Sequence, residues 1–184
     1  IKTFSTEYPQ VTYKLYSADA DDIKDRVNKG LLDICLLTEP VDVDKYDFIR
    51  IPQKERWGVI MRKDSPLAQE RSVAPEDLLA YPILIPGRAL VQNELDNWFG
   101  DAYGAVHIIG RYNLIYNAAI LVEAGVGVAL CLEKLVPVSE ETELCFRTLA
   151  PALETGVVIA WKKNQIFPPA VAKFIELLKN AFRA

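Results

Sequence analysis

The sequence is poor in the residues that most catalytic and metal sites require. It contains one histidine, His107, and three cysteines, Cys35, Cys131 and Cys145, without a C-x-x-C pair. A serine nucleophile needs a base, usually histidine, and no serine here lies in a G-x-S-x-G motif. His107 and the distant cysteines also lack the paired spacing of a zinc site. We therefore expect no catalytic residue and no metal, and we interpret His107 as a surface or hydrogen-bonded strand residue.

Two short motifs resemble cofactor or ion sites but are incomplete. Asp42, Asp44 and Asp47 suggest a calcium loop, but the sharp-turn glycine is missing and Gln53 replaces the bidentate glutamate. The segment Gly125-Val126-Gly127 joins a helix to a strand, whereas a dinucleotide fingerprint follows a strand and opens a helix. We expect no cofactor.

The chain also lacks a long apolar run and an excess of positive charge. No segment approaches the roughly 18 apolar residues of a membrane span, and the first residues do not form a signal peptide. Its 21 basic residues are outnumbered by 25 acidic ones, which disfavours direct binding to nucleic acid. The unpaired cysteines lie in apolar runs, as is typical of small core residues in a reducing cytoplasm. Because the chain starts without methionine, in the middle of a predicted helix, we interpret it as a fragment.

What the sequence does contain is a regular alternation of strand and helix patterns. Apolar or alternating runs predict the strands, and apolar residues at helical spacing, with caps such as Asp19 and stops such as Gly30 and Gly125, predict the helices. This order predicts an α/β fold with mostly parallel sheets. The predicted strands are 11–16, 31–37, 48–51, 57–62, 82–86, 106–110, 126–132, 144–149 and 156–162, and the main helices occupy about 19–29, 88–99, 114–124 and 169–182.

The carboxyl ends of these strands are the predicted binding edge. Right-handed crossovers bring the ends of parallel strands to one edge, where open α/β sheets bind ligands. The ends are Thr38, the run from Pro86 through Gly87 to Arg88, the pair Tyr112-Asn113, and Cys131-Leu132.

Several motifs, in the same order along nearly the whole chain, resemble the effector-binding domain of LysR-type bacterial transcriptional regulators. The Tyr8-Pro9 stop before a strand opens the resemblance, and Gly30-Leu31-Leu32-Asp33 carries the family's Gly-x-x-Asp spacing. Ser65-Pro66-Leu67-Ala68, followed by Pro75-Glu76-Asp77-Leu78, resembles the family's middle. The most specific string runs from Val122 to Leu130.

The resemblance implies a two-lobed, periplasmic-binding-protein-like fold with two crossover strands and a small-molecule effector bound between the lobes. Lobe I would comprise residues 1–52 and 157–184, and lobe II residues 53–156. The family's first strand is missing from this chain, and the winged helix-turn-helix that binds DNA would precede it.

The resemblance also assigns roles to some of the strand ends. Thr38 matches a position that often contacts the effector, and Gly87 and Arg88 match the facing edge of lobe II, where free amides and a helix dipole suit an anion. Asn113 is a further candidate, and the strand-end rule alone adds Pro86 and Cys131. The alternatives are a turn hydroxyl for Thr38, a solvated Arg88, and a helix N-cap or Asx turn for Asn113.

In such regulators, effector binding re-spaces the DNA-binding domains. The resemblance implies a homodimer, which becomes a tetramer in the full-length protein, with residues 11–15 facing the partner's helix 88–99. Two other function classes share the fold. A solute-binding protein of a transport system would act outside the cytoplasm, and an enzyme would need a cluster of catalytic groups that the sequence lacks.

Overall fold

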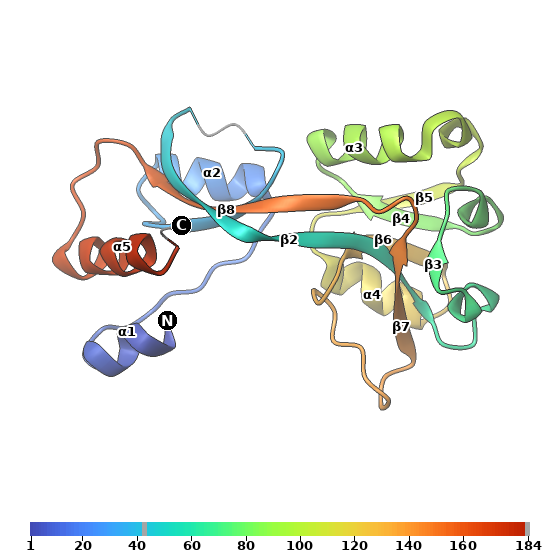
Figure 1. Ribbon diagram of the computed structural model, residues 1–184, viewed down its shortest axis with the longest axis horizontal. Helices are drawn as coiled ribbons and strands as arrows, with labels where there is room; N and C mark the ends of the chain where they lie inside the picture. Colours follow the sequence, from blue (N-terminus) through green and yellow to red (C-terminus); the bar gives the residue numbers. More distant parts are fainter. Residues whose placement is uncertain (42–43, 183–184) are drawn as a thin grey trace. The chain divides into compact units, whose positions relative to one another are not determined.

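The computed structural model describes residues 1–41 and 44–182, and the chain divides into two units (Figure 1). Unit 1 comprises Ile1–Gln53 and Gly156–Ala184, and unit 2 comprises Lys54–Thr155. Two neighbouring strands, β2 (Tyr46–Arg62) and β8 (Glu154–Lys162), cross the boundary between the units. The predicted α/β fold with two connecting strands is confirmed. Asp42, part of the rejected calcium loop, lies outside the described residues.

The helices of unit 1 begin and end where local sequence dictates. They are α1 (Lys2–Glu7), α2 (Ala20–Asn28) and α5 (Pro169–Ala181). The carboxylate of Asp19 accepts hydrogen bonds from the backbone N–H groups of Asp21 and Asp22, both at 3.0 Å, and so caps α2. Gly30, at φ +70°, ends the same helix in a conformation that side chains disfavour.

The sheet of unit 1 buries residues on both faces. Strand β1 (Cys35–Thr38) pairs with β8 antiparallel, with Cys35 opposite Ala160. Successive residues of β8 point to opposite faces. Val158 and Ala160 therefore join a cluster with α2, while Ile159 and Trp161 join one with α5.

The expected strand at residues 11–16 is absent, because that segment has no buried face. It forms an irregular stretch between α1 and α2, and the side chain of Leu15 is 80% exposed. The alternation of Val11, Tyr13 and Leu15 imitates a strand pattern without a core to bury it. The strand predicted at residues 31–37 was too long for the same reason. Leu31 is exposed, and β1 begins only at Cys35.

Strand β2 is a single element where the sequence predicted two separate strands. Its middle, around Pro52, is exposed and lies at the boundary between the units. Proline is tolerated in a strand where its missing N–H is not needed by a neighbour. The gap predicted between residues 51 and 57 is therefore part of the same strand, at the point where the strand passes from one unit to the other.

Unit 2 is a mixed sheet with helices on both faces. Its strands lie in the order β3-β7-β2-β6-β4-β5, and β4, β5 and β6 are parallel. However, β2 is antiparallel to both β6 and β7, so the expectation of mostly parallel sheets holds for β4, β5 and β6 and for the pair β3 and β7, but not for β2. The elements are η1 (Pro66–Gln69), β3 (Ser72–Val73), η2 (Glu76–Ala80), β4 (Ile83–Pro86), α3 (Ala89–Phe99), η3 (Gly100–Ala105), β5 (Ile108–Tyr112), α4 (Ile115–Glu123), β6 (Val128–Leu132) and β7 (Leu144–Leu149).

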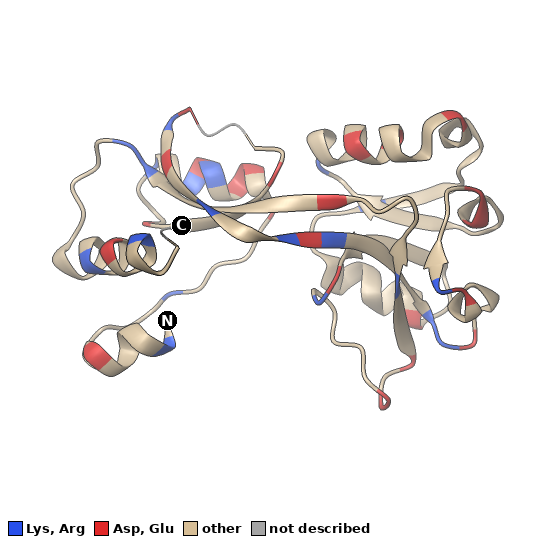
Figure 2. Ribbon diagram, viewed as in Figure 1, with Lys and Arg blue, Asp and Glu red and all other residues tan. Residues whose placement is uncertain are grey.

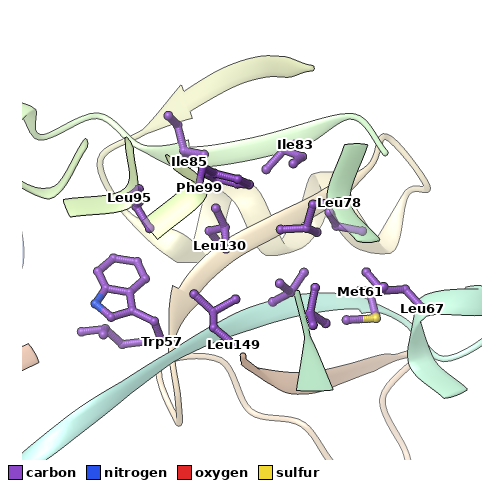
Figure 3. Packing of buried hydrophobic residues seen from close by; sticks show 14 of the residues in the cluster. Trp57, Met61, Leu67, Leu78, Ile83, Ile85, Leu95, Phe99, Leu130 and Leu149 are labelled. Atoms are coloured by element: carbon purple, nitrogen blue, oxygen red, sulfur yellow. The ribbon is translucent and has the colours of Figure 1, made fainter. Parts of the chain in front are cut away.

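Two hydrophobic clusters hold this sheet between its helices. On the α3 face, Leu95 and Phe99 pack over Ile85, Leu130 and other strand residues, as Figure 3 shows. On the α4 face, apolar residues of the helix pack against the alternate residues of the same strands. All five residues of β6 are buried, which explains the continuous apolar run that predicted it.

Candidate functional site

The parallel strands β4 and β5 end side by side in unit 2. Pro86 lies opposite Tyr112, and the N–H of Gly87 donates a hydrogen bond of 2.8 Å to the carbonyl oxygen of Tyr112. Gly87 is exposed, and a Cβ placed there would meet nothing closer than ordinary van der Waals contact. The structure therefore brings Pro86, Gly87 and Asn113, three of the residues selected by the strand-end rule, to one edge of the sheet.

Helix α3 begins at this edge without a side-chain cap. Arg88 is its N-cap residue, is half-buried, and makes no capping hydrogen bond with its side chain. The first N–H groups of a helix have no partner within the helix, and the helix dipole adds positive potential there. A helix N-terminus without a side-chain cap suits an anion.

Gln92 is a residue of this edge that the sequence analysis missed. Its side-chain amide donates hydrogen bonds to the carbonyl oxygens of Gly87, at 2.9 Å, and Pro86, at 3.3 Å. These bonds fix the turn between β4 and α3 from within the helix. The available signal was its position, one turn after Arg88, on the first turn of a predicted helix.

Asn113 does not cap helix α4, contrary to one of its interpretations. The N-cap residue is Leu114, and the side-chain oxygen of Asn113 accepts a hydrogen bond of 2.9 Å from the Leu114 N–H. This contact with the next residue leaves Asn113 exposed at the end of β5. Its amide lies on the same edge as Gly87.

Cys131 and Tyr112 stabilise the edge from the interior. Cys131 is only 1% exposed and packs in the α4-face cluster, and burial raises the pKa of its thiol to about 12. The hydroxyl of Tyr112 donates a 2.6 Å hydrogen bond to the carbonyl oxygen of Leu130, and burial also raises the pKa of this phenol. The thiol of Cys131 is therefore a neutral core group rather than a surface contact.

Thr38 belongs to unit 1, where it ends β1. It is half-buried and lies opposite Val157 of β8. The next residue, Glu39, accepts two hydrogen bonds from the guanidinium of Arg50, at 2.7 and 3.1 Å. Its carboxylate also occupies the space that a side chain at position 156 would need, which explains the glycine there. The negative charge beside Thr38 is thus compensated.

The histidine and the possible metal ligands of the described residues form no second cluster. His107 is exposed just before β5, and its carbonyl oxygen accepts a hydrogen bond from the Ile83 N–H. Residues 1–41 and 44–182 contain no group of three or more side chains that could hold a metal ion. Within the same ranges, no helix is long and apolar enough to cross a membrane.

Charge is interspersed over both units (Figure 2). Lys54, Glu55 and Arg56 alternate in sign along β2, and α3 contains acidic residues but no lysine or arginine. Phosphate backbones attract proteins through a continuous basic surface. The interspersed charges, like the acidic charge balance of the sequence, therefore disfavour direct binding to nucleic acid.

A family model described as the LysR substrate binding domain matches residues 1–183. The chain belongs to this family. An uncharacterized HTH-type transcriptional regulator of Bacillus subtilis (strain 168), YybE, is 25% identical over 184 residues. That match covers 99% of the chain but 62% of the regulator, so the LysR substrate binding domain described here spans less than two thirds of its relative.

Solved structures share the fold of this LysR domain. The effector binding domain of QuiR in complex with shikimate superposes with a TM-score of 0.81 at 14% identity, covering 98% of this chain and 87% of that one. The regulatory domain of Synechocystis PCC6803 CcmR in complex with 2-PG gives 0.79 at 17% identity, covering 99% and 88%.

Proposed function

We propose that this chain is the effector-binding domain of a LysR-type transcriptional regulator and that it binds a small organic anion. The observation that carries the proposal is the N-terminus of α3, which has Arg88 as its N-cap residue and no side-chain cap, at the shared end of β4 and β5. Asn113 supplies an exposed polar side chain at that edge, and Thr38 is the proposed contribution of unit 1. The N–H of Gly87, which the sequence suggested as a free amide, is instead bonded to the carbonyl oxygen of Tyr112. Shikimate, the ligand of QuiR, carries a carboxylate of the kind such a site suits.

We further propose that the domain acts in the cytoplasm and carries no enzymatic activity. Effector binding shifts the population of domain conformations, and a helix-turn-helix elsewhere in the full-length protein reads the shift on DNA. The half-buried or buried cysteines, none of them disulfide-bonded, support a reducing compartment.

A homodimer is the assembly we propose for this domain. Residues 11–15 and helix α3 are the proposed contact, although the first of these is not a strand as the sequence suggested. Both expose apolar side chains: Leu15 is 80% exposed and Leu90, on α3, is 42% exposed. Burying such groups against each other would stabilise a pair of chains.

The Arg88→Ala variant tests the effector site. A thermal-shift screen of small organic anions, including shikimate and other carboxylates, first identifies a compound that raises the melting temperature. Calorimetry should then show that Arg88→Ala weakens binding of this compound by about tenfold or more, because a charge-assisted hydrogen bond contributes roughly 1.5–3 kcal/mol.

The matched control is Arg71→Ala, which removes an exposed arginine from the same unit. This variant should bind the compound with unchanged affinity. Unchanged binding by Arg88→Ala itself would overturn the proposed site, and a screen without any stabilising anion would overturn the proposed ligand class.

A further inference from the structure

A cavity of about 420 Å³ opens in unit 2 beside the end of β6, and none of the proposed effector residues line it. This volume lies in the range of small-molecule sites. Residues of three strands and of the segment after β6 surround it. Its lining residues include Ile60, Leu132, Glu133, Lys134, Val136 and Phe146.

The floor of the cavity is apolar and is shaped by a glycine. Ile60 of β2 lies opposite Phe146 of β7, and both contribute to the α4-face cluster. A side chain at Gly58 would collide with the ring of Phe146 and with the carbonyl oxygen of Arg147. The missing side chain at Gly58 therefore lets the phenyl ring lie across β2, where it forms one wall of the cavity.

The segment after β6 exposes apolar side chains at the rim. Pro137 and Val138 both line the cavity and are exposed, Val138 by 42%. Removing apolar surface from water stabilises a complex by about 25 cal/mol per Å². A ligand with an apolar body would therefore gain free energy both from the floor and from this rim.

The charge at the rim favours an anion. Glu133 is held by Arg56 through two hydrogen bonds, of 3.0 and 3.1 Å, so its carboxylate is compensated. Lys134 is exposed, lines the cavity, and forms no ion pair with any part of the chain that the structure describes. Its backbone, at φ +66°, holds the turn that places the lysine at the cavity.

We propose that this cavity is a second small-molecule site, which binds an amphiphilic organic monoanion. The apolar body of the ligand lies against Ile60, Val136 and Phe146, and its carboxylate pairs with the ammonium of Lys134. The site lies wholly within unit 2 and does not depend on the proposed effector edge.

Octanoate and octan-1-ol are the probes for this site, because they share an apolar body and differ in charge. Titrated into the ¹⁵N-labelled chain, both should shift the backbone amide signals of residues 133–136 and 138. Octanoate should bind about threefold to fivefold tighter than octan-1-ol, the ratio that a partly solvated ion pair supports.

The Lys134→Asn variant tests the charge. Asparagine tolerates a positive φ, so the turn is retained. Its affinity for octanoate should fall to that for octan-1-ol, whereas Lys14→Asn, which removes an exposed lysine of unit 1, should keep the preference. A second variant, Val136→Phe, fills the cavity and should abolish binding of both probes.

Three outcomes would overturn the second site. These are an absence of shifts at residues 133–136 and 138, equal affinity of the wild-type chain for the two probes, and an unchanged octanoate preference in Lys134→Asn. Thermal unfolding shows whether Val136→Phe is folded. If it is not, Lys134→Asn decides alone, since it alters only an exposed side chain.

Discussion

At some positions the packing tolerates only one residue type without a loss of stability, and Gly58 is the clearest case. We predict that Gly58→Ala lowers the free energy of unfolding by about 1–3 kcal/mol, the usual cost of overpacking a core. The new methyl group would meet the ring of Phe146 and the backbone of Arg147. Urea titration monitored by circular dichroism measures the loss.

Gly104→Ala is the control for this prediction. No atom lies within 4 Å of the position that its Cβ would take, and its backbone needs no positive φ. Its stability should match or slightly exceed that of the wild type, because alanine restricts the unfolded chain. Equal stability of both glycine variants would contradict the packing argument.

The buried thiols predict an alkaline limit to stability. Burial raises the pKa of Cys35 to about 11 and that of Cys131 to about 12, from an ordinary value of 9.0. The folded chain therefore holds these protons more tightly than the unfolded chain. Their contribution to the free energy of unfolding is complete below about pH 9 and is lost as the pH rises towards 12.

Urea midpoints measured at pH 7.5 and pH 10 should show this loss. Cys131→Ala should reduce the difference between the two pH values, although it also leaves a small cavity. Cys145→Ala is the comparison variant. Because Cys145 is only half-buried, this substitution should reduce the difference less than Cys131→Ala does. A wild-type midpoint that rises between pH 7.5 and pH 10 would contradict the assignment.

At the scale of elements, the N-terminal end of α2 depends on one carboxylate. Asp19→Ala removes the acceptor for two backbone N–H groups and should lower the free energy of unfolding by about 1 kcal/mol. Asp25→Ala, in the same helix, loses only an exposed ion pair with Lys29 and should cost less than about 0.5 kcal/mol. Thermal unfolding of the two variants compares the losses of unfolding free energy. If the two variants lose equal amounts, Asp19 acts only through its charge and not through its capping hydrogen bonds.

Elements with a buried face were predictable from the sequence, and those without one were not. The apolar runs of β4, β6 and β7 and the periodic faces of α3, α4 and α5 correspond to elements of the structure. Residues 11–16 have the alternation of a strand but no core to bury it. The alternation of apolar and polar residues does not show whether a segment is buried. Burial depends on contacts between residues that are far apart in the sequence.

The candidate edge was partly predictable for the same kind of reason. Strand ends and a helix start are local signals, so Gly87, Arg88 and Asn113 could be identified. The bonds from Gln92 to the Pro86–Gly87 turn and the burial of Cys131 result from tertiary packing. Neither has a local signature.

At the scale of the whole molecule, the proposed homodimer makes a direct prediction. Leu15→Asp places a charge in the proposed contact and should shift the chain from dimer to monomer in sedimentation at micromolar concentration. Ile166→Asp is the control, because Ile166 is 95% exposed in an irregular segment of unit 1. It should leave the dimer intact. A monomeric wild type would argue against the proposed pairing altogether.

Unit 1 is assembled from two stretches of sequence that the whole of unit 2 separates. During synthesis on the ribosome, every residue of unit 2 therefore emerges before α5 and before the part of β8 that belongs to unit 1. Domains fold as units while translation proceeds. Val27 and Leu37 pack against β8 in the folded protein. Until β8 has been synthesised, their apolar side chains lack this contact. The first half of unit 1 is thus the part of this chain whose apolar surface stays uncovered longest during synthesis.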